Sequence, residues 1–371
     1  MAKLQIFKAT VQHFLGPILE FMDDPDVAEI MVNGPDEIYV EREGRLIQTD
    51  ARFEDEEALL SAINNVLQYT GKRLDPEHPL IDSRLPDGSR VHVVLSPPSR
   101  HGVCMTIRKF ARVKFDADYL ENVGSWTGEV REYLTNCVLA EKNLLVAGGT
   151  SSGKTSLLNV LSEFVPNRQR IVVIEDSAEL EMHQDHVISL EAQPPDRWGR
   201  GGVSIRDLFR SSLRLRPDRI IIGEVRGGEA LDMIQAMTSG HAGSMSTLHA
   251  NMPLDALNRL ETLALMSKVE LPLHALRAQI TSAIDVIVQV TRFSDGRRGL
   301  TQVSEVQPLG DDGKYRVQDM YTYDLGLSED GTREEGKLRW TGTTSQYARE
   351  PKVRILRDRI DLTKDVFASD D

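Results

Sequence analysis

Two patterns of apolar and polar residues follow one another along the chain, and the change near residue 110 predicts two domains. In the first region, short β-rich stretches predict strands at residues 29–32, 38–41 and 91–95. Residues 54–69 open with acidic side chains and then repeat leucine and isoleucine at helical spacing, which predicts a helix. Glu43 and Gly44 favour a hairpin turn. We therefore expect a small α+β domain over residues 1–110.

From residue 128 onward, predicted strands alternate with predicted helices. Short apolar runs that end in glycine or an acid predict buried strands at 143–147, 171–175 and 219–223. Helical segments are expected at 156–164, 205–215, 229–239, 254–266 and 271–283. This alternation predicts a mostly parallel sheet, so residues 128–371 should form an α/β domain that becomes β-rich from about residue 285. Residues 111–127 mix charge, glycine and serine, and we expect them to form the linker.

The most informative motif directly follows the first of these buried strands. Gly148, Gly153, Lys154 and Thr155 form the pattern G-x-x-x-x-G-K-T between a strand and a helix. Glycines let the backbone N–H groups surround phosphates, and the positive end of the following helix faces the same anion. The lysine supplies charge to the β- and γ-phosphates, and the threonine hydroxyl ligates Mg²⁺. The predicted ATP site comprises Gly148, Gly149, Thr150, Ser151, Ser152, Gly153, Lys154, Thr155 and Ser156.

Acidic residues end two further predicted strands. Glu175 and Asp176 close one strand, Glu179 lies just beyond them, and Glu224 closes another. The carboxyl ends of parallel strands meet at one edge of a sheet, so these acids can converge on the nucleotide. We expect Glu224 to polarise the attacking water, and Glu175, Asp176 and Glu179 to share metal and water positioning. A solvated strand-end acid is the alternative for Glu224, and a loop or helix-start acid for Glu179.

Composition and charge narrow the class of protein. The chain has 371 residues and a formal net charge of −13, which argues against a general nucleic-acid binder. No apolar run approaches the roughly 20 residues that span a bilayer, and the first residues lack a signal-peptide pattern, so we expect a cytoplasmic protein. Cys104 and Cys137 are far apart in sequence, and we expect both to be buried, inert thiols.

Several blocks together resemble the type II/IV secretion traffic ATPases, and in particular the CpaF type that drives Tad pili. The blocks in the second region are GGTSSGKT at 148–155, IEDSAELE at 174–181, LRLRPDRIIIGEVRGGEALDMIQAMTSG at 213–240 and HAGSMSTLHAN at 241–251. The likeness continues in QITSAIDVIVQVTRFSDGRRGLTQVSEV at 279–306. In the first region it includes DDPDVAEIMVNGPDEIYVEREGRL at 23–46, RLPDGSRVH at 84–92 and MTIRKF at 105–110. The resemblance thus covers most of the chain.

The resemblance implies a RecA-like P-loop NTPase core with a smaller N-terminal α+β domain of the PAS-like type. It also implies a homo-hexamer with nucleotide between subunits, in which Mg-ATP hydrolysis moves an inner-membrane platform protein. The motor would then be peripheral to that membrane, with no nucleic acid as partner. Within this family pattern, Glu175, Asp176 and Glu179 correspond to an acidic box and Glu224 to a strand-end glutamate. The chain departs from the pattern in lacking a longer N-terminal helical extension, and it lacks the four-cysteine zinc element of type II secretion assembly ATPases.

Two histidines and two arginines complete the candidate site. The resemblance assigns His241 and His249 to a histidine box that bonds near the γ-phosphate or to a neighbouring subunit. Without it, a structural histidine is the simpler interpretation, and a zinc site has too few ligands at suitable spacing. Arginine suits phosphate oxygens, so Arg90 and Arg108 are expected to reach the nucleotide from the first domain. Paired surface arginines are an equal alternative for these two.

Two other functions are compatible with a P-loop. A nucleic-acid motor shares this core, although the acidic balance and the absence of a basic, aromatic-rich channel sequence disfavour it. A nucleotide-dependent switch or scaffold would bind ATP with little hydrolysis, and the presence of Lys154, Thr155, Glu175 and Glu224 disfavours it. The sequence favours an ATP-hydrolysing motor.

Overall fold

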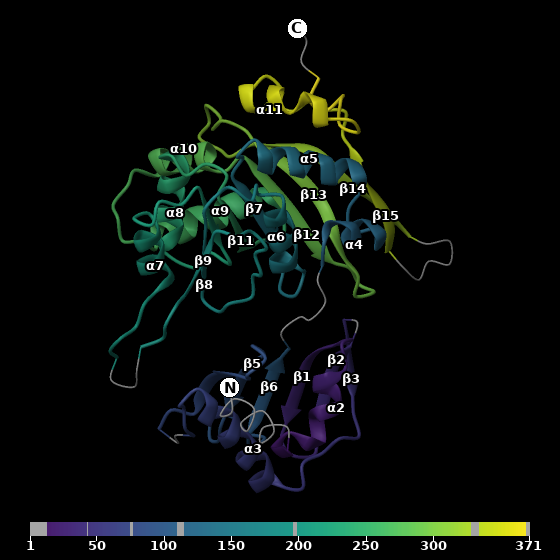
Figure 1. The fold of residues 1–371 in the computed structure, drawn as a ribbon, viewed down its shortest axis with the longest axis vertical. Helices are drawn as coiled ribbons and strands as arrows, with labels where there is room; N and C mark the ends of the chain where they lie inside the picture. The colour runs from purple at the N-terminus through teal and green to yellow at the C-terminus, as the bar shows by residue number, and fades with distance from the viewer. Residues whose placement is uncertain are drawn as a thin grey trace. The chain divides into compact units, whose positions relative to one another are not determined.

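The computed structural model describes residues 13–42, 44–74, 77–109, 115–195, 199–327 and 334–368. The chain divides into two compact units, Met1–Lys114 and Phe115–Asp371. Figure 1 labels most of the helices and strands of each unit.

The first unit is an antiparallel sheet with helices packed against it. Its six strands are β1 (Val27–Asn33), β2 (Ile38–Arg42), β3 (Arg45–Gln48), β4 (Leu80–Arg84), β5 (Arg90–Val94) and β6 (Cys104–Arg108), in the order β3-β2-β1-β6-β5-β4. The helices are η1 (Gly16–Ile18), α2 (Leu19–Asp23) and α3 (Glu56–Tyr69). Asp55 caps α3 by accepting a hydrogen bond from the Ala58 N–H at 2.8 Å. The buried face of α3 shares one core with the sheet.

The second unit is built on a nine-stranded sheet in the order β15-β14-β13-β12-β7-β11-β10-β8-β9. The strands from β12 to β9 in this order are parallel, and β13, β14 and β15 extend the sheet in antiparallel fashion. The parallel strands are β7 (Leu144–Gly148), β8 (Ile171–Glu175), β9 (Val187–Glu191), β10 (Arg219–Ile222), β11 (Met245–His249) and β12 (Val286–Arg292). The antiparallel strands are β13 (Arg298–Val306), β14 (Val317–Leu327) and β15 (Glu334–Trp340).

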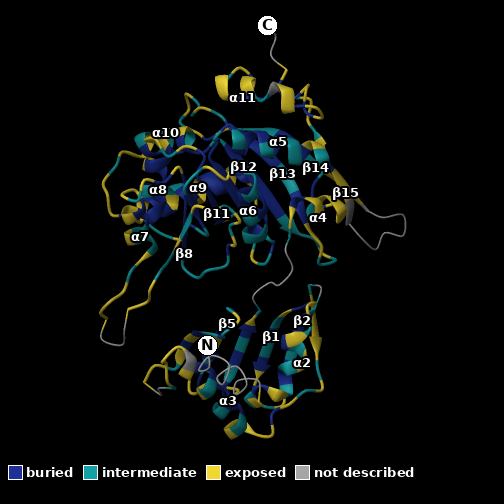
Figure 2. Ribbon diagram, viewed as in Figure 1, coloured by how far each residue is buried: buried dark blue, intermediate teal, exposed yellow. Residues whose placement is uncertain are grey.

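Helices cover both faces of this sheet. The helices are α4 (Ala117–Asn122), α5 (Gly128–Leu139), α6 (Lys154–Glu163), α7 (Ile205–Ser212), α8 (Glu229–Thr238), α9 (Pro253–Leu265), α10 (Leu273–Ala283), α11 (Pro351–Ile355) and η2 (Arg357–Arg359). Alternate residues of β7 belong to different cores: Leu144 and Val146 pack with α5 and α6, and Leu145 and Ala147 with α8, α9 and α10. The central strands are accordingly dark blue in Figure 2. Apolar runs without alternation are expected in such two-sided strands.

The boundary between the units corrects the predicted linker. Residues 111–114 lie outside the described residues, but from Asp116 the chain already belongs to the second unit. Asp116 caps α4, and Trp126 is buried with its indole N–H donating to the Ala117 carbonyl at 3.2 Å. The polar composition of 115–127 misled the prediction because α4 buries only its first residue, Ala117.

The predicted hairpin turn falls partly on Glu43, which is outside the described residues, although β2 and β3 do pair with Arg42 opposite Arg45. The β-rich end of the chain contains strands of up to 11 residues, followed by the short helices α11 and η2. No periodic apolar pattern predicted these two helices. In the described part of the chain, no helix is both long and apolar enough to cross a membrane.

Candidate nucleotide-binding site

The predicted P-loop connects β7 to α6 at the carboxyl edge of the parallel strands. Gly153 caps α6 with φ of 96°, and Ser151 also has a positive φ of 57°. Gly148 has no room for a side chain, since a Cβ there would lie 2.4 Å from Ser152 Oγ and 2.6 Å from the Val290 carbonyl oxygen. Glycine is therefore required at both ends of the turn, at Gly148 by packing and at Gly153 by backbone conformation. The turn leaves the first N–H groups of the ten-residue helix α6 at this edge of the sheet.

Lys154 begins α6, and its side chain turns back across the loop. Its ammonium donates to the Gly149 carbonyl at 2.7 Å and lies 3.3 Å from His249 Nδ1. Ser152 Oγ donates to the same carbonyl at 2.9 Å. Lys154 is 7% exposed, which is unusual for lysine unless its charge has polar partners. The loop thus holds one positive charge beside its backbone N–H groups.

His249 joins Lys154 to Glu224. Strands β7 and β11 are adjacent, with His249 opposite Gly148, and this register brings the imidazole to the P-loop. Its Nε2 lies 3.3 Å from Glu224 Oε1. Because an ammonium can only donate, Nδ1 is the accepting nitrogen and the proton lies on Nε2, facing the carboxylate. Burial and the charge of Lys154 hold the pKa of His249 below its usual value, which favours this neutral form.

Glu224 is fixed by its backbone as well as by its side chain. The Thr247 hydroxyl donates to the Gly223 carbonyl at 2.7 Å, and the Val225 N–H donates to the Thr247 carbonyl at 3.0 Å. Both bonds bind the segment after β10 to the neighbouring strand β11. Glu224 Oε2 accepts from Arg226 at 3.0 Å, which leaves the carboxylate between a guanidinium and an imidazole.

Arg226 also links Glu224 to the acids after β8. Its second nitrogen donates to Asp176 Oδ2 at 2.7 Å. The carboxylates of Glu224 and Asp176 are therefore brought together across two adjacent strands by a shared arginine. Hydrogen bonding to Glu224 and the nearby acids raise the pKa of Arg226 further above neutral pH. Arg226 is a site residue that the sequence argument did not single out, although its position two residues after Glu224 was a usable signal.

Glu175 lies beneath this surface. It is 3% exposed, and its Oε1 accepts hydrogen bonds from the Glu179 N–H at 2.8 Å and the Leu180 N–H at 3.0 Å. Burial raises the pKa of Glu175 to about 7, against the lowering effect of the two N–H groups. Gly223 makes space for it, since a Cβ on Gly223 would lie 3.0 Å from Glu175 Cγ. Glu179 is thus bonded to Glu175 through its backbone.

An arginine that is distant in sequence contacts the P-loop. Arg298, the first residue of β13, donates from Nε to the Ser151 carbonyl at 2.9 Å. Its Cδ would be 3.5 Å from a Cβ on Gly153. The chain separation of 147 residues explains why sequence reasoning missed this contact. Only the pairing of β12 with both β7 and β13 brings Arg298 there.

His241 does not join this group, and its predicted place beside the bound phosphates is wrong for the nucleotide of the same subunit. It precedes β11, whereas the P-loop follows the carboxyl end of the adjacent parallel strand β7. His249 is the last residue of β11 and His241 lies before its first, and the strand alone spans about 13 Å at about 3.3 Å per residue. The eight-residue spacing of His241 and His249 spans a whole strand, which puts them at opposite edges of the sheet.

Arg90 and Arg108 lie in the first unit. They face each other on the adjacent strands β5 and β6, and Arg108 is also opposite Glu29 on β1. Directly opposite residues of antiparallel strands share one face of the sheet, so the two guanidinium-bearing side chains are neighbours. Their predicted contact with phosphate stays a prediction. Among the described residues, no group of three or more His, Cys, Asp or Glu side chains is arranged to hold a metal ion.

Comparison with known proteins points to one family. The sequence profile described as "Type II/IV secretion system protein" matches residues 12–323. A type IV secretion system protein PtlH homolog of Bordetella bronchiseptica is 36% identical over 316 residues, which cover 77% of this chain and 91% of that protein. Conjugal transfer protein TrbB of Rhizobium radiobacter is 33% identical over 282 residues, which cover 75% of this chain and 83% of that protein. The solved structure of the pilus retraction motor PilT with bound ADP has a TM-score of 0.54 at 17% identity, covering 95% of this chain and 96% of that chain.

The fold and the P-loop site define a P-loop ATPase, with a RecA-like core and a smaller N-terminal α+β domain. The predicted fold class and enzyme class are confirmed. The chain belongs to the type II/IV secretion system protein family, as its sequence motifs predicted. It is thus a secretion ATPase.

Proposed function

We propose that the chain is a hexameric motor that hydrolyses Mg-ATP to drive assembly of a Tad-like type IV pilus or a related secretion machine. The main support for ATP hydrolysis is the position of His249 between two other site residues. It lies 3.3 Å from the ammonium of Lys154 and 3.3 Å from the carboxylate of Glu224, and it thereby links the P-loop lysine to a carboxylate. A switch that only binds nucleotide has no need of a carboxylate fixed at this distance. The names of the relatives, a secretion protein and a conjugal transfer protein, support a machine that acts at a membrane.

In this proposal, the P-loop residues from Gly148 to Ser156 hold the phosphates through backbone N–H groups and Lys154. Glu224 orients and polarises the attacking water, and His249 fixes the orientation of that carboxylate. Arg226 neutralises Glu224 and Asp176 until phosphate competes for its guanidinium. Glu175 holds the loop that follows β8, because its carboxylate accepts the backbone N–H groups of Glu179 and Leu180.

The donor atoms at the P-loop fit Mg²⁺. The ion is usually held by one or two protein oxygens together with substrate phosphates and waters. Thr155, in the first turn of α6, and Asp176 offer such oxygens, and both are partly accessible. Glu175 would support the ion indirectly, because it is buried and its Oε1 accepts two backbone N–H bonds. When bound, the ion would supply charge compensation on the β- and γ-phosphates.

The remaining parts of the proposal concern location and partners. We infer a cytoplasmic hexamer that is held at the inner membrane by a platform protein, with no nucleic acid bound. His241 would act across a subunit boundary, since its own P-loop is at the other edge of the sheet. Arg90 and Arg108 would contact phosphate in the nucleotide-bound protein. Replacing Arg108 with alanine should then lower ATP turnover. If turnover is unchanged, the proposed contact of Arg108 with phosphate is wrong.

The cellular experiment is complementation in the source bacterium. A strain lacking the gene should lose surface pili or secretion, the wild-type gene should restore them, and Lys154→Ala should not. Native mass measurement of the purified protein with Mg-ATP should give six subunits. If the strain without the gene keeps its pili and secretion, the proposed role in such machines is wrong.

A further inference from the structure

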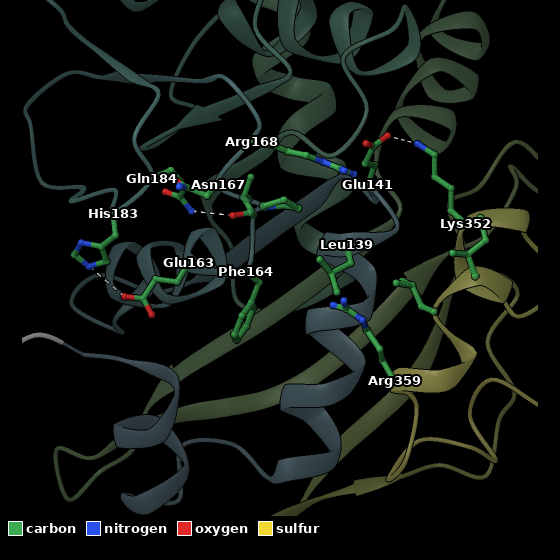
Figure 3. Close-up of a pocket in the computed structure, with 14 residues that line it drawn as sticks. Leu139, Glu141, Glu163, Phe164, Asn167, Arg168, His183, Gln184, Lys352 and Arg359 are labelled. Atoms are coloured by element: carbon green, nitrogen blue, oxygen red, sulfur yellow. Dashed lines mark hydrogen bonds and ion pairs between the residues drawn. The ribbon is translucent and has the colours of Figure 1, made fainter.

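The second unit has an open groove that lies away from the P-loop. Its cavity volume is about 1180 Å³, and it is lined by the residues that follow α5 and α6 and by the segment of α11 and η2. Figure 3 shows the ion pair of Glu141 with Lys352 and the contact of Glu163 with His183, and it shows Phe164 and Leu139 on the wall of the groove. The wall made by α11 and η2 lies beyond residue 323, where the match to the family profile ends.

The groove is at the edge of the sheet opposite the nucleotide site. Its residues Glu141, Arg168 and Gln184 come just before strands β7, β8 and β9, whereas the P-loop and the acids follow the carboxyl ends of the strands. Helix α6 connects the two sites: it begins at Lys154 and ends at Glu163, a length of about 15 Å. A molecule in the groove therefore leaves the nucleotide site open.

The charges in the groove are unlike those of the whole chain. The chain carries a net charge of −13, but the groove has three cations, Arg168, Lys352 and Arg359, against two acids. Both acids already have partners, Glu141 with Lys352 and Glu163 with His183. Within the described part of the chain, the exposed guanidinium groups of Arg168 and Arg359 make no hydrogen bond or ion pair. Two forked donors are thus available to carboxylates.

Apolar surface lies beside these arginines. Ile355 is 80% exposed, and Phe164, Leu139 and Leu356 are only partly buried. These apolar side chains line the same groove, and their exposure to water has no structural benefit. Apolar side chains rimmed by charged ones, with arginine and an aromatic residue among them, are typical of protein-binding surfaces. The cavity also exceeds the roughly 300–1,000 Å³ of small-molecule sites.

We propose that this groove binds an acidic, amphipathic segment of a partner protein. Apolar side chains of the segment would cover Ile355 and Phe164, and its carboxylates would pair with Arg168 and Arg359. Bidentate carboxylate–guanidinium pairs would give the contact its selectivity for acidic sequences. Because the wall of α11 and η2 lies outside the family profile, the partner is expected to be particular to the machine that this chain serves.

The test uses a fluorescein-labelled amphipathic helical peptide with leucines on one face flanked by glutamates, and a matched peptide with lysines in place of the glutamates. Fluorescence anisotropy with the full-length protein should show binding of the acidic peptide only. The double substitution Arg168→Gln with Arg359→Gln should weaken it at least about tenfold, since the two lost ion pairs together exceed about 1.4 kcal/mol. Ile355→Ser should weaken it as well, and added salt should weaken it in the wild type.

Arg354→Gln is the matched control, because Arg354 is an exposed residue of α11 that does not line the groove. It should bind the acidic peptide as the wild type does. All these positions are exposed, so the substitutions should leave the fold intact. Unchanged ATP turnover and an unchanged thermal unfolding temperature would confirm that the variants are folded. Equal binding of both peptides, binding of neither, or equal loss in Arg354→Gln and in the double variant would overturn the proposal. A loss of oligomer mass in the double variant without peptide binding would assign the groove to a second copy of the chain instead.

Discussion

Single side chains at the nucleotide site owe their properties to the strands beside them. Glu175 is buried, yet it accepts two backbone N–H bonds, and burial prevails in raising its pKa to about 7. Burial and the charge of Lys154, 3.3 Å away, hold the pKa of His249 below its usual value, although the carboxylate of Glu224 acts in the opposite direction. The P-loop and the acids could be predicted from the sequence, because each follows a recognisable strand. The contacts of His249, Arg226 and Arg298 could not, since they depend on which strands are neighbours.

Glu175 should make the stability of the second unit depend on pH. Its pKa in the folded protein, about 7, exceeds the ordinary value of 4.5, so the folded state binds the proton more tightly. This contribution to stability is fully present below about pH 4.5 and is lost as the pH rises through about 7. Relative to Glu175→Gln, the wild type should lose about 3 kcal/mol of unfolding free energy over that range. Urea unfolding of both proteins across the range measures the difference, and a pH-independent difference would contradict the burial argument.

Arg298 should help to hold the P-loop in its binding conformation. Arg298→Ala removes the hydrogen bond to the Ser151 carbonyl, which is worth about 1 kcal/mol, so ATP should bind about fivefold more weakly. Arg297→Ala is the control, because it removes a neighbouring arginine of the same hairpin, which pairs with Asp295 at 2.6 Å. Equilibrium titration with a fluorescent ATP analogue compares the two. Equal affinities for the two variants would show that Arg298 does not restrain the loop.

At the scale of elements, the sequence predicted the strands and helices that bury regular apolar patterns. Strands β7, β8 and β10 are buried on both faces, and their apolar runs identified them to within one residue. Strand β11 was missed because it buries Ser246 and Thr247, and the Thr247 hydroxyl is used to hold Gly223. Strand β9 was missed because it has no fully buried position. Elements that bury polar groups for a contact have no apolar pattern to detect.

In the turn before β11, an alanine substitution should destabilise the protein much more at one glycine than at another. Gly243 and Gly240 both have positive φ, 78° and 103°, so alanine is strained at either. Only at Gly243 would the Cβ meet another group, at 1.3 Å from Arg219 Nη1. Arg219 is fully buried and donates to the Val138 carbonyl and to Gln169, both at 2.8 Å, so it cannot move aside freely. Gly243→Ala should therefore cost at least about 2 kcal/mol more than Gly240→Ala.

Chemical denaturation followed by circular dichroism measures the free energy of unfolding of the two glycine variants. Equal destabilisation by the two substitutions would mean that the position of the Arg219 guanidinium is not restrained by its hydrogen bonds.

At the scale of the whole molecule, two units of different architecture share one chain. The sequence predicted both fold types, because antiparallel and parallel sheets have different apolar patterns. It placed the start of the second unit too late, since α4 presents little apolar surface and Trp126 enters the core from an irregular segment. The structure also contains a segment after β15 that no sequence motif predicted. Hydrogen bonds and an ion pair attach this segment to the core of the second unit. Glu132 accepts three backbone N–H groups of that segment, and Lys142 pairs with Glu350 at 2.7 Å.

The central claim is that the Lys154, His249 and Glu224 series makes this chain a hydrolysing motor. Steady-state ATP turnover and oligomer mass, measured together with Mg-ATP for wild type, Lys154→Ala and Glu224→Gln, test it most directly. We predict a hexamer that turns over ATP for the wild type, loss of ATP binding for Lys154→Ala, and ATP binding with at least about a hundredfold slower turnover for Glu224→Gln. A wild-type protein that binds ATP as a monomer without turnover, even with membrane extract added, would contradict the account.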